Sequence, residues 1–260
     1  MRSQMRKNRV KEMLKSGKPV VGTFLVSRSI ANLEILALQG FDFVMIDTEH
    51  FMKNPETIEH LIIAAEAAGI TPFVRVQDDL RLIDLALSAG ARGILVPMCN
   101  TREIAQTAVD LAKYAPVGKR GVCNPRAVTY GAGGLQDMFS FFQTENENIL
   151  ILAQVETAQA VQNLDEIISV QGIDVVTIGQ VDLSQTMGIL CKLDHPRLEE
   201  TIQRIFKETK TRGIPVGIFA FDGNEATERI RQGFNFVSLA NDALFLSQGA
   251  AEEMRKVRRA

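Results

Sequence analysis

The sequence predicts a closed α/β barrel, (β/α)8, in which eight parallel strands alternate with helices. Two observations lead to this fold class. The chain of 260 residues contains eight short apolar runs, and most are followed by an amphipathic segment with helical spacing. The apolar runs are continuous rather than alternating, as expected for parallel strands covered on both faces. The length is typical of one such barrel, so a single domain over residues 1–260 is predicted.

The elements follow one another regularly along the chain. A short helix over residues 8–16 carries Val10, Met13 and Leu14 at helical spacing and is expected to close the bottom of the barrel. The expected strands span residues 20–25, 41–46, 71–76, 92–98, 149–155, 173–179, 214–220 and 234–240. The expected helices span residues 30–38, 55–69, 79–90, 101–114, 160–168, 198–212, 224–232 and 243–257. Ser29 and Thr101 are suitable N-caps.

The first strand is followed by residues 24–27, Phe-Leu-Val-Ser, which do not form the glycine-rich nucleotide turn of a doubly wound sheet. The closed barrel is therefore preferred over that open alternative. Regular alternation stops between residues 115 and 148, where glycine and proline interrupt any long periodicity. Loops of this length inside a compact domain are usually lids or binding elements, so this segment is expected to be one.

Composition excludes several classes of function. The formal net charge of −2 and pI of about 6.0 provide no electrostatic footprint for nucleic acid or an anionic membrane. No run of about 18 apolar residues occurs, and residues 1–18 lack the apolar region of a signal peptide. The cysteines, Cys99, Cys123 and Cys191, form no CxxC pair and leave an odd count. We expect a cytoplasmic protein that binds neither nucleic acid nor membrane.

Two neighbouring strands end in carboxylates. Glu156 follows the fifth expected strand and Asp182 follows the sixth, so both should emerge at the carboxyl edge of one sheet. Oxygen ligands of this kind suit a hard divalent cation, and magnesium completes its octahedron with water and substrate. The alternative is that each is only an acid at a helix N-terminus, stabilised by backbone N–H groups.

Other strands carry further groups to the same edge, where the active site of such a barrel lies. His50 follows the second strand, and either Asp47 or Glu49 can orient its imidazole as a general base. Arg75 ends an apolar strand, where it needs a structural carboxylate or an anionic ligand as partner. No lysine ends a strand, and Lys53 is the nearest, so Schiff-base chemistry is disfavoured.

With these residues in view, the chain resembles the HpcH/HpaI aldolases, which are metal-dependent pyruvate aldolases, from Gly22 to about Gly249. The matching segments are residues 47–50 (DTEH), 74–75 (VR), 93–98 (GILVPM), 120–122 (RGV), 126–127 (RA), 130–131 (YG), 154–157 (QVET), 163–167 (NLDEI), 178–179 (IG) and 182–184 (DLS). Taken in order, these segments are specific, although most are not specific alone.

The resemblance implies a class II aldehyde-lyase that cleaves or forms 4-hydroxy-2-oxo acids from pyruvate and an aldehyde. It implies that Glu156 and Asp182 hold Mg²⁺, Mn²⁺ or Co²⁺, which pyruvate chelates. It implies catalytic roles for His50, which Asp47 orients, and for Arg75, which stabilises the enolate oxygen. Substrate-binding positions are implied for Arg75, Gln154, the backbone of Val181 and Asp182, and the pocket residues Phe24 and Phe219.

One departure from the family concerns the turn before Asp182. Relatives commonly have proline after the glycine, where this chain has Gly179-Gln180-Val181-Asp182. The loss of proline makes the turn less rigid, and Val181 adds a β-branched side chain beside the expected carboxylate site. Thr177 also stands where an aromatic residue can occur. These changes bear on the substrate more than on the reaction.

Alternatives to aldol chemistry remain at this stage. The same metal-enolate site could serve oxaloacetate decarboxylation or an addition like that of macrophomate synthase. A weakly catalytic barrel that binds a keto acid is another alternative. Members of the family are typically hexamers that exchange the last helix between subunits. Leu244, Phe245, Leu246 and Met254 fit such a partner, or equally a helix docked on its own barrel.

Overall fold

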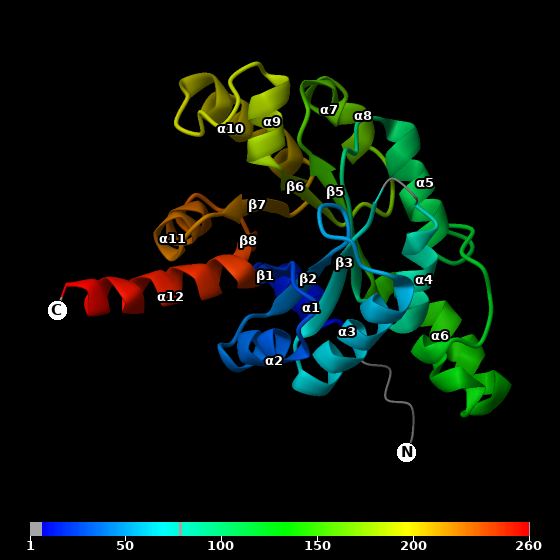
Figure 1. Ribbon diagram of the computed structural model, residues 1–260. Helices are drawn as coiled ribbons and strands as arrows, with labels where there is room; N and C mark the ends of the chain where they lie inside the picture. Colours follow the sequence, from blue (N-terminus) through cyan, green and yellow to red (C-terminus); the bar gives the residue numbers. More distant parts are fainter. Residues whose placement is uncertain (1–6, 78–79, 260) are drawn as a thin grey trace.

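The computed structural model describes residues 7–77 and 80–259 and contains a closed barrel of parallel strands ordered β1 to β8 (Figure 1). The strands are β1 (Val20–Leu25), β2 (Phe43–Asp47), β3 (Thr71–Arg75), β4 (Gly93–Val96), β5 (Leu150–Val155), β6 (Val175–Ile178), β7 (Val216–Ala220) and β8 (Phe236–Asn241). Val20 of β1 lies opposite Phe236 of β8, and this pairing closes the sheet. The predicted fold class is confirmed, with strand ends within two residues of those expected.

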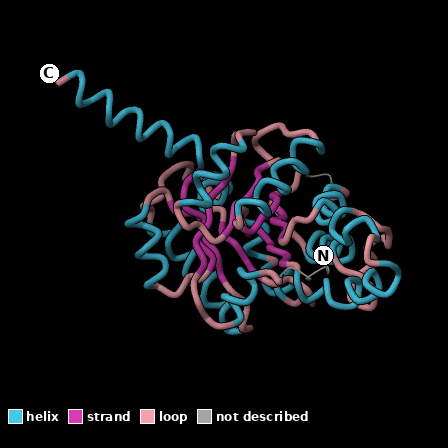
Figure 2. The backbone as a smooth tube through the Cα atoms, turned by 90° about the horizontal axis from the view of Figure 1, so that it is seen from below, coloured by secondary structure: helices cyan, strands magenta, loops and turns pink. Residues whose placement is uncertain are grey.

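Helices surround the strands, as the tube view from below shows (Figure 2). They are α1 (Arg9–Lys15), α2 (Ile30–Leu38), α3 (Pro55–Ala68), α4 (Leu82–Ala89), α5 (Arg102–Ala112), η1 (Arg126–Gly131), α6 (Gly134–Asn148), α7 (Ala158–Gln162), α8 (Leu164–Ile168), α9 (Gln180–Thr186), α10 (Pro196–Thr211), α11 (Gly223–Arg231) and α12 (Asp242–Arg258). Ser29 and Thr101 accept backbone N–H groups as the predicted caps of α2 and α5. Asp79, the expected start of the helix after β3, lies outside the described residues.

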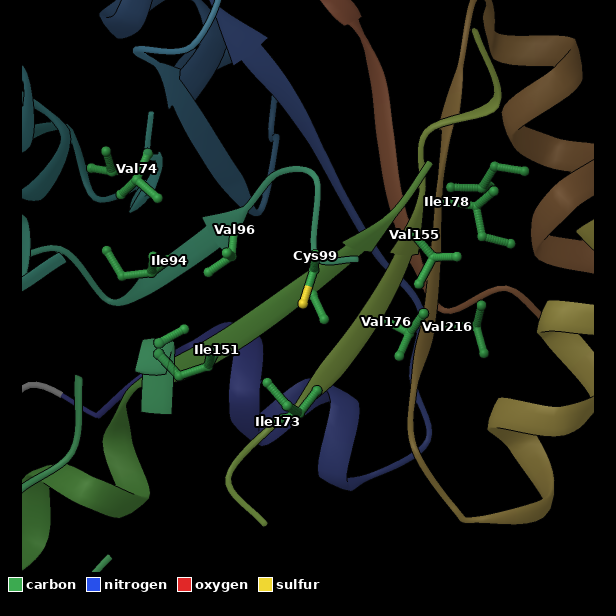
Figure 3. Close-up of a cluster of buried hydrophobic side chains, with 14 of the residues drawn as sticks. Val74, Ile94, Val96, Cys99, Ile151, Val155, Ile173, Val176, Ile178 and Val216 are labelled. Atoms are coloured by element: carbon green, nitrogen blue, oxygen red, sulfur yellow. The ribbon is translucent and has the colours of Figure 1, made fainter. Parts of the chain in front are cut away.

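Apolar side chains fill two layers, one between strands and helices and one inside the barrel. Figure 3 shows part of the outer layer, including Ile94 of β4, Ile151 of β5 and Val176 of β6. Inside the barrel, the rings of Phe43 and Phe236 stack with centroids 4.3 Å apart. These rings close the lower half of the barrel, so space for a ligand lies at the carboxyl ends of the strands.

The bottom of the barrel is closed by α1, as predicted. The Asn8 side chain donates to the Arg92 carbonyl oxygen over 2.9 Å, just before β4 begins. Lys11 Nζ donates to the Ile149 carbonyl oxygen over 2.8 Å and to Asp174 over 2.7 Å, before β5 and β6. These contacts fix α1 against the amino ends of three strands.

The expectation of a long loop over residues 115–148 is wrong for its second half, because α6 covers Gly134–Asn148. Phe141 and Phe142 of α6 pack on Tyr114, and Glu145 pairs with Arg92 at 3.3 Å. Arg92 precedes β4, so α6 lies toward the bottom of the barrel (Figure 1). No described residue of 115–148 lines the cavity at the opposite end, so this segment is not a lid of its own barrel.

The last helix, α12, leaves the barrel (Figures 1 and 2). Phe245 still packs on Phe41, with ring centroids 6.0 Å apart. From Leu246 to Arg259 every residue is exposed, so this part of α12 is not docked on its own barrel. No helix in residues 7–77 and 80–259 is long and apolar enough to cross a membrane.

Candidate active site

A cavity of about 300 Å³ opens at the carboxyl ends of the strands. Its lining includes eight of the nine residues that the sequence proposes for the site, and Glu156 lies buried behind them. The lining residues are Phe24, Val26, Asp47, His50, Phe51, Arg75, Leu95, Gln154, Thr177, Ile178, Gly179, Gln180, Val181, Asp182, Ile218, Phe219, Phe221, Ser238 and Asn241. The closed barrel thus brings together groups far apart in sequence.

Arg75 is held in one orientation by two carboxylates. Its Nε donates to Asp47 Oδ1 over 2.9 Å and its Nη2 to Asp47 Oδ2 over 2.7 Å, while Nη1 lies 3.1 Å from Glu49 Oε2. Asp47 and Arg75 are directly paired in the register of β2 and β3, which explains the two-point contact. Burial by itself would lower the pKa of Arg75, but the hydrogen bonds and charge of Asp47 outweigh it and raise that pKa.

His50 lies at the mouth of the cavity with its side chain 54% exposed. Its Nε2 is 3.7 Å from Glu49 Oε2, so Glu49 is the carboxylate that pairs with it. Asp47 instead directs both oxygens to Arg75. Of the two orienting carboxylates considered from sequence, the geometry therefore favours Glu49. Glu49 also joins His50 to Arg75 through one shared oxygen.

Glu156 is buried, with 2% of its surface exposed, and is held by donors from both sides. Its Oε1 accepts the Met98 N–H over 2.6 Å, and its Oε2 accepts from Gln154 Nε2. Met98 has a positive φ of 47°, a conformation that is costly for a residue with a side chain. The backbone after β4 is thus bent so that an N–H faces this carboxylate.

The turn after β6 approaches Glu156 closely. A Cβ at Gly179 would lie 2.7 Å from Glu156 Cβ and would overlap its carboxylate, so only glycine fits. Gly179 precedes the short helix α9, whose first turn contains Val181 and Asp182. The first N–H groups of any helix lack intrahelical partners, so those of Val181 and Asp182 remain available at the cavity wall.

The electrostatics of Glu156 suit a cation. Burial, together with the charges of Glu49 and Asp182, raises the pKa of Glu156 to about 7 although the Met98 N–H lowers it. Burial likewise raises the pKa of Glu49, against the lowering effect of Arg75. Carboxylates whose charged form is disfavoured by burial and by neighbouring negative charge are donors that a bound cation stabilises.

The donor set fits magnesium or a similar ion. Gln154 Oε1 is buried without a hydrogen-bond partner among the described residues, beside Glu156. The residues described here contain no group of three His, Cys, Asp or Glu side chains placed to hold a metal. A cation at Glu156 and Asp182 would therefore take its remaining ligands from water and substrate, which is the usual arrangement for magnesium.

Some lining residues were not found from sequence. Ser238 lies directly opposite Phe219 in the register of β7 and β8, and Phe221 follows β7. Side chains along a barrel strand alternate between the inside and the outside. Which of them face inward could be assigned only once the strand register was known. Lys53, considered for Schiff-base chemistry, donates to the carbonyl oxygens of Val26 and Asp47 over 3.0 and 2.7 Å and does not line the cavity.

Comparison with known families agrees with this geometry. The family model for HpcH/HpaI aldolase/citrate lyase matches residues 21–248. A hydroxypyruvate/pyruvate aldolase of Rhizorhabdus wittichii is 34% identical over 256 residues, covering 96% of this chain and 99% of the relative.

Two solved structures are also similar over almost the whole chain. An HpcH/HpaI aldolase from Desulfitobacterium hafniense superimposes with a TM-score of 0.90 at 30% identity, covering 96% of both chains. The citrate synthase SbnG superimposes with a TM-score of 0.87 at 31% identity, covering 96% of this chain and 97% of that one. The second similarity shows that close relatives of this barrel include an enzyme with a different name and reaction.

Proposed function

Since this chain belongs to the HpcH/HpaI aldolase/citrate lyase family, we propose that it is a divalent-metal-dependent aldolase acting on 4-hydroxy-2-oxo acids. Family membership places it among the carbon–carbon lyases. The proposed reaction is reversible cleavage of the C3–C4 bond to pyruvate and an aldehyde. One observation carries the proposal: Asp182 and a carboxylate-clamped Arg75 line one cavity, and Glu156 is buried behind that lining.

Glu156 and Asp182 would hold Mg²⁺, Mn²⁺ or Co²⁺, with Gln154 Oε1 facing a water or substrate ligand of the ion. When bound, the ion supplies positive charge where negative charge develops on the keto oxygen. The available N–H groups of Val181 and Asp182 would receive the substrate carboxylate.

Arg75 adds a second positive group, and its orientation is fixed. A guanidinium has five N–H groups, so it retains donors for a substrate oxygen while three contacts bind Asp47 and Glu49. Because these carboxylates fix it before substrate arrives, Arg75 can stabilise developing charge without reorganisation.

His50 would move the proton. In the cleavage direction its imidazole accepts the proton of the C4 hydroxyl, the C4–O bond becomes the aldehyde carbonyl, and the C3–C4 electron pair remains with the 2-oxo acid fragment. Protonation at C3 then yields pyruvate. Glu49, 3.7 Å from Nε2, stabilises the protonated imidazole between these two transfers.

Deuterium exchange at the pyruvate methyl group, followed by NMR, tests this site without an aldehyde. We expect chelator-treated protein to be inactive and added Mg²⁺, Mn²⁺ or Co²⁺ to restore exchange. Glu156→Gln should abolish metal-dependent exchange, and His50→Ala should slow it by about 10²–10⁴-fold because the base is lost. If the metal binds but no exchange occurs with any ion, the proposal is wrong.

Matched controls separate these effects from general damage. Glu200→Gln changes an exposed glutamate of α10, and His60→Ala an exposed histidine of α3, both outside the cavity. Both should exchange like the unaltered protein. Equal losses in Glu200→Gln and Glu156→Gln would point to a change in folding and would contradict a metal role for Glu156.

The structural similarity to citrate synthase SbnG supports a second candidate reaction, addition to an acceptor other than an aldehyde. Oxaloacetate decarboxylation is a further candidate at the same site. Oxaloacetate decarboxylation needs no base, because loss of CO₂ itself leaves the electron pair on C3. His50→Ala should therefore spare decarboxylation and slow exchange if both reactions use this cavity. Addition of pyruvate to an acceptor other than an aldehyde also begins with loss of a C3 proton, so His50→Ala should slow it as it slows exchange. It would use the end of the cavity formed by Glu156, Asp182 and Arg75.

We also propose that α12 binds a second copy of the chain, within a homo-oligomer that the family resemblance suggests is a hexamer. Support comes from Leu246, Met254 and Val257, which are exposed on the helix that leaves the barrel. A cytoplasmic location is proposed from the three free cysteines, two of them exposed.

A further inference from the structure

One side of the cavity is aromatic and takes no part in the proton transfers or bond cleavage proposed for this site. Phe24 of β1, Phe219 of β7 and Phe221 form this aromatic wall. The ring centroids of Phe24 and Phe219 are 6.0 Å apart, and Phe221 meets Phe219 edge-on at 5.0 Å and 82°. All three line the cavity. Contacts between rings fix the wall as one surface, which favours apolar ligands.

The groups in this cavity's described lining that can carry positive charge lie beside carboxylates. Among its described lining residues, only Arg75 and His50 can carry positive charge. Arg75 faces Asp47 and Glu49, and His50 lies beside Glu49. Asp182 adds another negative charge to the lining. A carboxylate, sulfonate or phosphate on the far end of an acceptor would therefore find no uncommitted cation in the described lining and would meet repulsion.

Hydrogen-bonding groups beside the wall are also few. Ser238 is the register neighbour of Phe219. The Asn241 side-chain oxygen already accepts the Leu244 N–H over 2.8 Å, and Gln180 already donates to Glu225 over 3.3 Å. Thr177 offers one buried hydroxyl without a partner among the described residues, next to Gln154 at the polar end. A polyhydroxylated tail would leave several hydroxyl groups unsatisfied, which costs affinity.

We propose that the aldehyde partner of this enzyme is uncharged and has an apolar tail, aliphatic or aromatic, that lies on the aromatic wall. The inference rests on the proposed function, in which the 2-oxo acid occupies the polar end formed by Glu156, Asp182 and Arg75. The lining away from that end then includes Phe24, Phe219 and Phe221.

Matched pairs of aldehydes test the proposal on the metal-loaded protein with pyruvate. In each pair the polar groups of one member are replaced by groups of similar shape: succinic semialdehyde against 4-methylpentanal, and glyceraldehyde against 2-methylbutanal. We expect kcat/KM for the apolar member to be at least about tenfold higher in both pairs. Along propanal, butanal and pentanal it should rise roughly fourfold per methylene group.

Phe221→Arg adds a cation at the wall. The ratio of kcat/KM for succinic semialdehyde to that for 4-methylpentanal should rise at least about tenfold in this variant. Because the ratio is measured on one preparation, loss of folded protein cancels. Phe139→Arg, at an exposed position of α6 outside the cavity, is the matched control and should leave the ratio as in the unaltered protein.

The outcomes distinguish this inference from the proposed function. Methyl exchange of pyruvate together with a preference for succinic semialdehyde or glyceraldehyde would overturn the apolar acceptor alone. An unchanged ratio in Phe221→Arg would also contradict a tail lying on the aromatic wall. Absence of pyruvate exchange with every ion would overturn the proposed function, and the acceptor assignment would fall with it.

Discussion

At the scale of single residues, the site depends on close approach rather than on the number of charged groups. Glu156 is fixed by the Met98 N–H and by Gln154, and Gly179 leaves room for it. Arg75 is fixed by Asp47 and Glu49. Glu156 and Arg75 therefore have defined orientations before a ligand binds, which is how buried polar sites obtain their effect on a reaction.

Gly179→Ala tests this dependence. The new Cβ must displace Glu156 or the start of α9, so we expect pyruvate exchange to fall by about 10–100-fold. Gly223→Ala is the control, since a Cβ there meets nothing within 4 Å and Gly223 has no positive φ. Exchange assays and thermal unfolding of both variants provide the measurement. Equal activity of the two variants would contradict a tightly packed Glu156.

At the scale of elements, strand ends position catalytic groups and helix ends secure the opposite side of the barrel. Lys113, the residue after α5, donates to the carbonyl oxygens of Asn146 and Ile149 over 2.8 and 3.0 Å and lies 3.4 Å from Asp174. It thereby joins α5 and α6 to the amino ends of β5 and β6. Burial lowers the pKa of Lys113 to about 8, although Asp174 opposes the change.

This lowered pKa predicts a pH dependence of stability. Between pH about 8 and 10.5 the folded protein has released the Lys113 proton while the unfolded chain still binds it. The unfolding free energy should therefore gain up to about 3 kcal/mol from this group as pH rises through that window. Below about pH 8 Lys113 is protonated in both the folded and the unfolded chain, so this gain in unfolding free energy is absent.

The measurement is urea unfolding across pH 7–11 for the unaltered protein and for Lys113→Met. The difference between their unfolding free energies should change across the window, because other groups titrate equally in both. Lys192→Met, an exposed lysine, should show no such change. A pH-independent difference for Lys113→Met would contradict the lowered pKa.

At the scale of the whole molecule, the barrel is compact but α12 is not part of its core. Leu246, Met254 and Val257 are 69%, 48% and 67% exposed. An apolar stripe on a projecting helix is typical of an interface that another chain covers. The charged residues between these positions form pairs within the helix, such as Arg255 with Glu252 at 2.7 Å.

Leu246→Glu combined with Val257→Glu should dissociate the oligomer, because each change places a charge in the apolar stripe. Light scattering after size exclusion should show a large fall in mass, while circular dichroism should retain the barrel signal. Glu252→Gln, a change at an exposed charged residue of α12 away from the apolar stripe, should leave the mass unchanged. A monomeric unaltered protein would contradict the proposed interface.

The sequence by itself determined the strands, most helices and the carboxyl-edge positions of Asp47, Arg75, Glu156 and Asp182. These features depend on local periodicity, on caps such as Ser29, and on the rule that parallel strands end at one edge. Local signals of this kind can be read along the chain without knowing which strands are neighbours.

The tertiary structure alone decided how those groups pair. Asp47 binds Arg75 because β2 and β3 place them opposite each other, and Glu49 is left beside His50. The aromatic wall exists because β8 pairs with β1, which brings Phe219 beside Phe24 although they are far apart in sequence. Contacts of this kind follow from barrel closure and register, which no local pattern contains.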